Sequence, residues 1–162
     1  MSPANAAVHT TVATVVERDG KVLMVEERAT EPDASTTVWN QPAGHWESGE
    51  SLIAAAQRET LEETGWQVEI TYLLGIYTFV APNGDSYCRV CFAAKPIQQL
   101  SSRLDPDILR ADWLDPRSVL QQPDCWRSHL VGRAIKDYLD GKRYPLEIVQ
   151  EDPMLSPFNY SV

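Results

Sequence analysis

The residues best suited to chemistry are three glutamates that recur at helical spacing. Glu59, Glu62 and Glu63 stand at positions i, i+3 and i+4, so in a helix their side chains fall within about 100° of arc on one face. Like charges at this spacing destabilise an isolated helix. Hard divalent cations prefer oxygen ligands. The cluster therefore predicts a divalent metal site, and the alternative for three glutamates alone is a solvated acidic helix face.

The residues around these glutamates form a longer pattern between residues 44 and 66. Its fixed positions are Gly44, Glu50, Arg58, Glu59, Glu62, Glu63 and Gly65. This spacing resembles the signature of the Nudix hydrolases, a family that cleaves nucleoside diphosphates linked to other groups, and related pyrophosphates, with magnesium or manganese. Thr60 and Trp66 depart from the resemblance, because the family mostly has aliphatic residues at these two packing positions.

The resemblance implies a role for each carboxylate. Hydrolysis of a P–O–P bond requires neutralised phosphate charge, an activated water and a stabilised leaving oxygen, all of which divalent metals supply. Glu59 and Glu63 are the expected ligands of Mg²⁺, with Mn²⁺ as the alternative, and Glu62 binds a second metal or shares the work. The backbone carbonyl of Ala43 is a further expected ligand. The expected catalytic residues are Arg58, Glu59, Glu62 and Glu63. Members of the family differ in which glutamate acts as the base, so the resemblance assigns that role to none of them.

The remaining motif residues are expected to hold the loop and helix in place. Arg58 should orient a carboxylate through an ion pair, with Glu50 or Glu62 as the partner. Glu50 is expected to stabilise the loop rather than to bind the metal. Gly44 and Gly65 allow the turns into and out of the helix.

Residues outside the motif are candidates for contacts with substrate. The candidates are Trp39, His45, Arg28, Arg89 and Tyr77, with Phe79 and Tyr87 as further members of an aromatic wall. Tyr77 and Phe79 are two apart and share one face of a strand. The alternative for each aromatic residue is a place in the core, and for each arginine a place on the surface. Asp107 either reaches the metal site or belongs to a polar turn.

The sequence pattern predicts strands before and after one central helix. Strands are predicted over residues 9–17, 21–26, 39–43, 68–80, 87–94 and 109–114, with a hairpin signal at Asp19-Gly20, a loop over 28–37 and a break at Gly75. Helices are predicted over 52–64, between Ser51 and Gly65, and over 127–139. This order predicts an α+β fold. The resemblance implies an α/β/α sandwich, with a mixed β-sheet, a catalytic loop–helix–loop and a C-terminal helix.

The bulk properties bound the function. The 162 residues predict one domain, 1–162, with a core over about 8–150 and short flexible tails at both ends. A net charge of −9 argues against a nucleic-acid polymer or an anionic membrane as the partner. The amino-terminal residues lack the features of a signal peptide, and three cysteines in a chain of this size predict reduced thiols in the cytoplasm. We expect a monomer, with a homodimer as the alternative.

Two further segments narrow the expected substrate. Residues 39–45 and 143–147 resemble those of bacterial phosphatases within the family, which implies release of phosphate from hydroxymethylpyrimidine pyrophosphate, thiamine pyrophosphate and nucleoside tri- and diphosphates. One alternative is a house-cleaning nucleoside triphosphate pyrophosphohydrolase. Another is a regulatory, nucleotide-binding Nudix domain, but such domains have lost catalytic glutamates, whereas Glu59, Glu62 and Glu63 are all present here.

Overall fold

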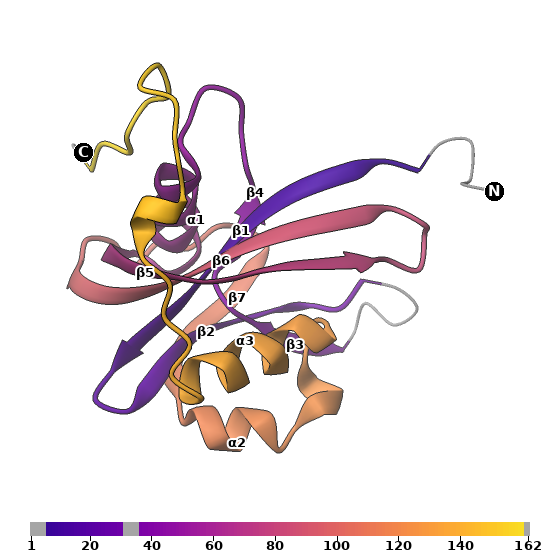
Figure 1. Ribbon diagram of the computed structural model, residues 1–162. Coiled ribbons are helices and arrows are strands. Elements are labelled where there is room, and N and C mark those ends of the chain that lie inside the picture. Colours follow the sequence, from indigo (N-terminus) through magenta and orange to yellow (C-terminus); the bar gives the residue numbers. More distant parts are fainter. Residues whose placement is uncertain (1–5, 31–35, 161–162) are drawn as a thin grey trace.

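The computed structural model describes residues 6–30 and 36–160. Half of the predicted loop over 28–37, namely residues 31–35, and the outermost residues of both tails lie outside this part of the chain. Within it, seven strands form one mixed sheet (Figure 1). The strands are β1 Val8–Arg18, β2 Lys21–Arg28, β3 Thr37–Asn40, β4 Ala43–His45, β5 Trp66–Val80, β6 Ser86–Gln99 and β7 Ile108–Leu114.

Strand β1 joins two halves of this sheet. From Val8 to Val16 it pairs in parallel with β6, and it also pairs with β4. Only its last two residues, Glu17 and Arg18, pair with β2, in the antiparallel sense. Strands β5, β6, β1 and β4 therefore form one half, and β3, β2 and β7 form the other. The two halves diverge from the β1–β2 turn (Figure 1).

The β1–β2 connection follows from its sequence. Asp19 and Gly20 both adopt positive φ angles, 52° and 77°, which a two-residue hairpin of this type requires. The hairpin predicted at these residues is confirmed. The break predicted at Gly75 is a shift in the β5–β6 register between Leu73 and Gly75, and the strand continues beyond it.

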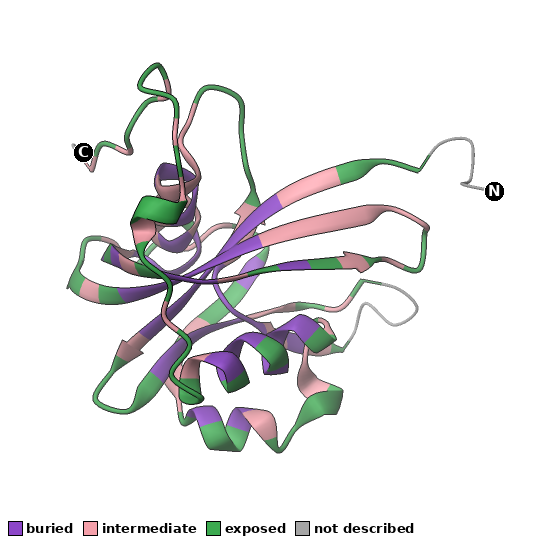
Figure 2. Ribbon diagram, viewed as in Figure 1, coloured by how far each residue is buried: buried purple, intermediate pink, exposed green. Residues whose placement is uncertain are grey.

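Three α-helices cover the sheet: α1 Leu52–Thr64, α2 Pro116–Leu120 and α3 His129–Leu139. Ala55 and Ala56 of α1 belong to one apolar cluster, and Val119 of α2 and Ile135 of α3 belong to another. The buried parts of the strands lie where the strands cross, at the centre of the molecule (Figure 2). The predicted α+β fold, with a mixed sheet between helices, is confirmed.

The sequence did not predict helix α2. It has five residues, begins at Pro116 and is capped by the carboxylate of Asp115, which accepts the N–H of Arg117. Such a short element is too brief for a recurring apolar pattern. No helix in the described part of the chain is long and apolar enough to span a membrane.

Candidate active site

Helix α1 carries the predicted glutamates, and local signals fix both of its ends. The side chain of Ser51 accepts the N–H of Ala54 at 2.9 Å and caps the first turn. Gly65 ends the helix at a φ of 76°. A Cβ atom at Gly65 would lie 1.8 Å from the carbonyl oxygen of Ser101, so this position accepts only glycine.

The guanidinium group of Arg58 holds the motif together. Its Nε and Nη2 atoms donate to the two carboxylate oxygens of Glu50 at 2.9 and 2.8 Å. Its Nη1 atom donates to Glu59 at 2.8 Å and to Glu62 at 3.2 Å, and Nη2 also donates to the carbonyl of His45 at 3.0 Å. The structure therefore brings both predicted partners, Glu50 and Glu62, to Arg58. Such forked, charge-assisted bonds fix the geometry of the carboxylates.

The pKa values in this network reflect those bonds. Burial opposes ionisation of Glu50, but hydrogen bonds from Arg58 and from the N–H of Glu47 outweigh it and lower the pKa of Glu50. The hydrogen bond to Glu50 raises the pKa of Arg58 above its ordinary value, against the effect of burial. Glu50 and Arg58 are thus a stable ion pair.

Glu59 packs against the backbone of the loop before α1. A Cβ atom at Gly44 would lie 2.1 Å from its carboxyl carbon, so a side chain there would displace it. Burial raises the pKa of Glu59, and the negative charges of Glu62 and Glu47 add to that effect, although Arg58 opposes them. Gly44 therefore lets a partly buried, negatively charged group approach the strand β4.

Glu63 is the most buried of the three glutamates, with 9% of its surface exposed. In the described chain, its carboxylate accepts the backbone N–H of Ala43 at 3.2 Å and forms no ion pair within 4 Å. Burial, together with the negative charges of Glu59, Glu27 and Asp105, raises the pKa of Glu63 well above its ordinary value. A buried carboxylate without a cationic partner is costly unless a bound cation compensates it.

Two charged residues that the sequence analysis did not identify lie near Glu63. Glu27 on β2 is 3.4 Å from Nε of Arg127, and both line a cavity of about 380 Å³ with Arg28 and Asp107. Burial raises the pKa of Glu27, while Arg127 and Arg89 oppose that rise. Neither residue belongs to a local motif, so only the pairing of distant segments brings them together.

The structure separates the two readings of Asp107. Its N–H bonds to the carboxylate of Asp105 at 2.9 Å, which is the geometry of a polar turn. Asp107 is exposed and influences Glu27, whereas Asp105 is the residue whose charge influences Glu63.

Arg89 is partly buried and its Nε atom is fully buried, so the alternative of a surface position does not describe it. It pairs across the strands with Thr11, and its Nη1 atom donates to Asn40 at 3.5 Å. Its Nε atom and the Oγ1 atom of Thr11 are both buried and have no hydrogen-bond partner among the described residues. Burial lowers the pKa of Arg89, while the negative charges of Glu27 and Glu63 oppose that change. Two buried polar atoms without partners on adjacent strands indicate a place for a ligand or a water molecule.

Five rings form a continuous row beside this place. His9 stacks on Tyr87, and Tyr87 stacks on Phe79, with centroids 4.8 and 4.9 Å apart. His45 and His129 meet the two ends of the row edge-on, at 5.5 and 6.0 Å. The row joins strands β4, β1, β6 and β5 to helix α3, and it includes two of the aromatic residues that the sequence singled out.

The NUDIX domain matches residues 7–131, three quarters of the chain, including the whole network around Arg58. The protein belongs to the Nudix family. The chain is 38% identical over 143 residues to the phosphatase NudJ of Escherichia coli, covering 87% of this chain and 90% of that protein. It also resembles the solved structure of a NUDIX hydrolase from Nitrosomonas europaea, with a TM-score of 0.83, 40% identity and coverage of 89% and 97% of the two chains. A MutT NUDIX hydrolase from Burkholderia pseudomallei, at 22% identity and a TM-score of 0.65, shares the fold.

Nudix hydrolases generally use divalent metals, so we compared the donor atoms with that requirement. The described residues contain no three carboxylate, imidazole or thiolate groups that converge on one point. The reason is local, because Glu59 and Glu62 turn toward Arg58 while Glu63 turns toward Ala43. The chemistry of the donors nevertheless fits Mg²⁺ or Mn²⁺, since all are oxygen atoms and the buried Glu63 lacks a cation.

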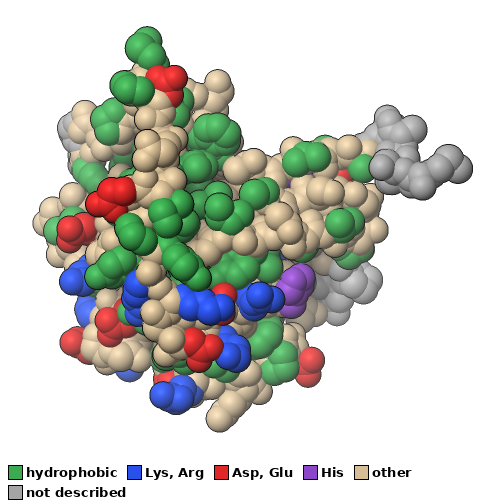
Figure 3. Space-filling view, viewed as in Figure 1, with side chains coloured by type: hydrophobic (Ala, Val, Ile, Leu, Met, Phe, Trp, Pro, Cys, Tyr) green, Lys and Arg blue, Asp and Glu red, His purple; other side chains and the backbone are tan. Residues whose placement is uncertain are grey.

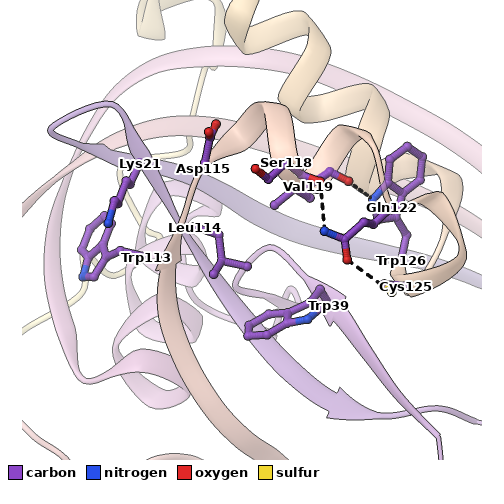
Figure 4. Close-up of a pocket in the computed structure, with 10 residues that line it drawn as sticks. All are labelled: Lys21, Trp39, Trp113, Leu114, Asp115, Ser118, Val119, Gln122, Cys125 and Trp126. Atoms are coloured by element: carbon purple, nitrogen blue, oxygen red, sulfur yellow. Dashed lines mark hydrogen bonds between the residues drawn. The ribbon is translucent and has the colours of Figure 1, made fainter.

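Trp39 lies on the other side of β3 from this Nudix site, which corrects its predicted contact with substrate. It lines a cavity of about 430 Å³ with Trp113, Trp126 and Val119, on the side of the sheet covered by α2 (Figure 4). Successive side chains of a strand point to opposite faces. Asn40, the next residue, is therefore the one that faces Arg89.

Tyr77 is also not available to substrate. It is 8% exposed, and its hydroxyl donates to Asp137 of α3 at 2.8 Å. Phe79 shares its face of β5 but lies farther along the strand, where it meets His129 at the start of α3 and joins the row of rings. Tyr77 therefore takes the core position given as its alternative, because spacing assigns a residue to a face and does not show what covers that face.

Proposed function

We propose that this Nudix protein is a Mg²⁺-dependent hydrolase of pyrophosphate bonds in small molecules. The proposed substrates are hydroxymethylpyrimidine pyrophosphate, thiamine pyrophosphate and nucleoside di- and triphosphates, with release of orthophosphate. The observation that carries the proposal is the buried Glu63, which lies beside the ordered Arg58 network and has no cationic partner within residues 6–30 and 36–160. The identity to NudJ, which is named a phosphatase, supports it.

Each motif residue has a role in this proposal. Glu59, Glu62 and Glu63, with the carbonyl of Ala43, would hold Mg²⁺ or Mn²⁺, which when bound neutralises phosphate charge and lowers the pKa of a water molecule. Arg58 fixes the carboxylates of Glu59 and Glu62, and Glu50 fixes Arg58. The resulting order avoids reorganisation during the reaction.

The phosphate groups of the substrate would meet the arginines of the site. The buried Nε atom of Arg89 is free to donate to a phosphate oxygen, and Asn40 orients the same guanidinium. Arg127 and Arg28 line the neighbouring cavity and would attract the remaining negative charge. These arginines supply local positive charge in a chain with a net charge of −9.

The organic part of the substrate would lie along the row of rings. His45 stands next to Gly44 at the start of the motif and meets His9 edge-on at 5.5 Å. From there the row leads away from the glutamates to Phe79. Rings of this kind pack well against a planar pyrimidine or thiazolium ring. We further propose that the protein works as a monomer in the cytoplasm, and its three cysteines are free.

A substrate panel with Mg²⁺, scored separately for orthophosphate and pyrophosphate, tests the proposal. We expect orthophosphate from thiamine pyrophosphate, and no product from any substrate once EDTA removes the metal. Pyrophosphate release from nucleoside triphosphates alone would favour a house-cleaning enzyme. Binding of nucleotides with no hydrolysis would favour a regulatory domain.

A further inference from the structure

The last described segment of the chain lies against the catalytic helix. It starts after the short turn Leu146–Ile148 and runs along the side of the molecule that carries α1 (Figure 1, yellow). Val149 packs on the apolar cluster that includes Ala55 and Ala56 of α1. We call residues 149–160 the C-terminal strap. The sequence predicts a flexible tail after residue 150, whereas the strap makes specific contacts with the motif.

The first of these contacts is the carboxylate of Glu151 at the start of α1. It accepts the N–H of Leu52 at 2.5 Å and that of Ile53 at 3.4 Å. Ser51 accepts the next N–H, that of Ala54. The first three free N–H groups of the catalytic helix thus all have acceptors, and a carboxylate is favoured at this end of a helix.

The second contact flanks Glu50. The N–H of Ser156 donates to the carbonyl of Gly49 at 2.9 Å, and the N–H of Ser51 donates to the carbonyl of Ser156 at 3.3 Å. Glu50 is therefore held as if in a short parallel strand pair with the strap.

A continuous chain of hydrogen bonds joins these contacts to Glu59. Glu50 receives two hydrogen bonds from Arg58, and Arg58 donates to Glu59. The strap fixes the backbone on both sides of Glu50 and the first turn of α1. It therefore controls the two segments whose relative position sets the Arg58–Glu59 geometry.

We propose that Glu151 is a positioning residue for the hydrolytic reaction, acting through the start of α1 and the Glu50–Arg58 pair. The inference rests on the proposed function only in taking Glu59 and its neighbours as the catalytic group. A side chain 99 residues from Leu52 thereby becomes part of the Nudix site.

The test compares Glu151→Ala and Glu151→Gln with wild type in the full chain. Glu147→Ala is the matched control, because Glu147 is an exposed carboxylate in the preceding turn. The measurements are kcat and KM for orthophosphate release from thiamine pyrophosphate, the dissociation constant of Mg²⁺ by calorimetry, and hydrogen exchange at Leu52 and Ile53. For Glu151→Ala we expect kcat to fall about fivefold with KM changed less than about twofold. We also expect weaker Mg²⁺ binding and faster exchange at both amides.

Glu151→Gln keeps an acceptor at the helix start, so its kcat, Mg²⁺ affinity and exchange rates should lie between those of wild type and Glu151→Ala. If the alanine variant does not fold, the same measurements on Glu151→Gln test the inference. Unchanged kcat and Mg²⁺ binding in a folded Glu151→Ala protein would overturn the inference, even if exchange increases. A wild-type protein that hydrolyses nothing would refute the proposed function instead. Weaker Mg²⁺ binding by Glu151→Ala would then still support the positioning role.

Discussion

Helices α1 and α3 each bury one carboxylate, and the two carboxylates are treated in opposite ways. Glu63 of α1 is 9% exposed and Asp137 of α3 is 6% exposed. Asp137 accepts the hydroxyl of Tyr77 at 2.8 Å and lies 2.9 Å from Nζ of Lys142 and 3.8 Å from Nε of Arg133. Glu63 has one backbone N–H, from Ala43, and acidic neighbours.

The pKa directions follow from these surroundings. Burial would raise the pKa of Asp137, but hydrogen bonds from Lys142 and Tyr77 outweigh it and lower the pKa. Burial raises the pKa of Glu63; the hydrogen bond from the N–H of Ala43 opposes that rise, but acidic neighbours add to it. Lys and Arg side chains gather over α3 on the face that Figure 3 shows. Asp137 therefore has cationic and hydroxyl partners within the protein, whereas Glu63 has no cationic partner among the described residues.

The two helices also differ in the residues that they bury. Helix α3 buries Leu130, Val131 and Ile135 and is an ordinary amphipathic helix. Helix α1 buries three alanines and two threonines with Glu63, and depends on caps at both ends. A helix whose buried face is small and polar contributes less to the apolar core, which indicates that α1 is shaped for its site.

Glu63→Gln should produce the largest effect. The amide cannot supply a charged oxygen to a metal, so we expect Mg²⁺-dependent kcat to fall at least about 100-fold. Steady-state orthophosphate release measures it, with Glu69→Gln, an exposed glutamate on β5, as the control. Wild-type kcat in Glu63→Gln would remove Glu63 from the site.

Arg58→Lys should have the next largest effect. Lysine keeps the charge but lacks the forked donors that hold Glu50 and Glu59 together. Loss of a residue that orients metal ligands costs about 10- to 100-fold in activity, and kcat with saturating Mg²⁺ is the measurement. A lysine variant with full activity would show that charge alone suffices.

Asp137→Asn should affect stability and leave activity intact. The variant weakens bonds to Lys142 and Tyr77, so we expect a loss of about 2 kcal/mol in the free energy of unfolding and a Tm lower by about 5 °C. Thermal unfolding measures the loss. Activity measured well below the Tm should match that of wild type. A large fall in kcat of the folded variant would contradict a purely structural role for Asp137.

The smallest effect is the pH dependence of stability without metal. Because the folded-state pKa of Glu63 lies above its ordinary value of 4.5, the folded protein keeps a proton that the unfolded chain releases. Stability therefore falls as pH rises through that window. Urea unfolding in EDTA should show that the free energy of unfolding of Glu63→Gln rises relative to that of wild type between pH 5 and pH 8.

Asp137 provides the opposite case in the same experiment. Its folded-state pKa lies below 3.8, so its contribution is present above that pH and is lost only as pH falls through the folded value. The stability gap between wild type and Asp137→Asn should stay constant from pH 5 to pH 8. A gap that varies over this range would contradict the lowered pKa.

Much of the fold could be predicted because its signals are local. Asp19-Gly20, Ser51 and Gly65 set the ends of elements through their own backbone preferences. Ala56, Thr60 and Thr64, which recur at helical spacing in α1, are all buried. Glu50 and Glu62, the two partners expected for Arg58, lie within eight residues of it along the chain, so the sequence could name them.

The rest of the site depends on segments that meet only in the folded chain. Arg89 is enclosed because its strand, β6, pairs with β1 and its side chain reaches Asn40 of β3. Trp39 and Tyr77 turn away from the glutamates because α2 and α3 cover their faces. Glu151 reaches α1 across 99 residues. The periodic spacing of residues within one strand or helix predicts none of these long-range contacts.

The most direct measurement is calorimetric binding of Mg²⁺ to metal-free wild type, Glu63→Gln and Asp137→Asn. If Glu63 is the buried carboxylate that requires a cation, Asp137→Asn binds Mg²⁺ as wild type does and Glu63→Gln binds it at least about tenfold more weakly. Equal Mg²⁺ affinity in wild type and Glu63→Gln would contradict the assignment of α1 as the metal-binding helix.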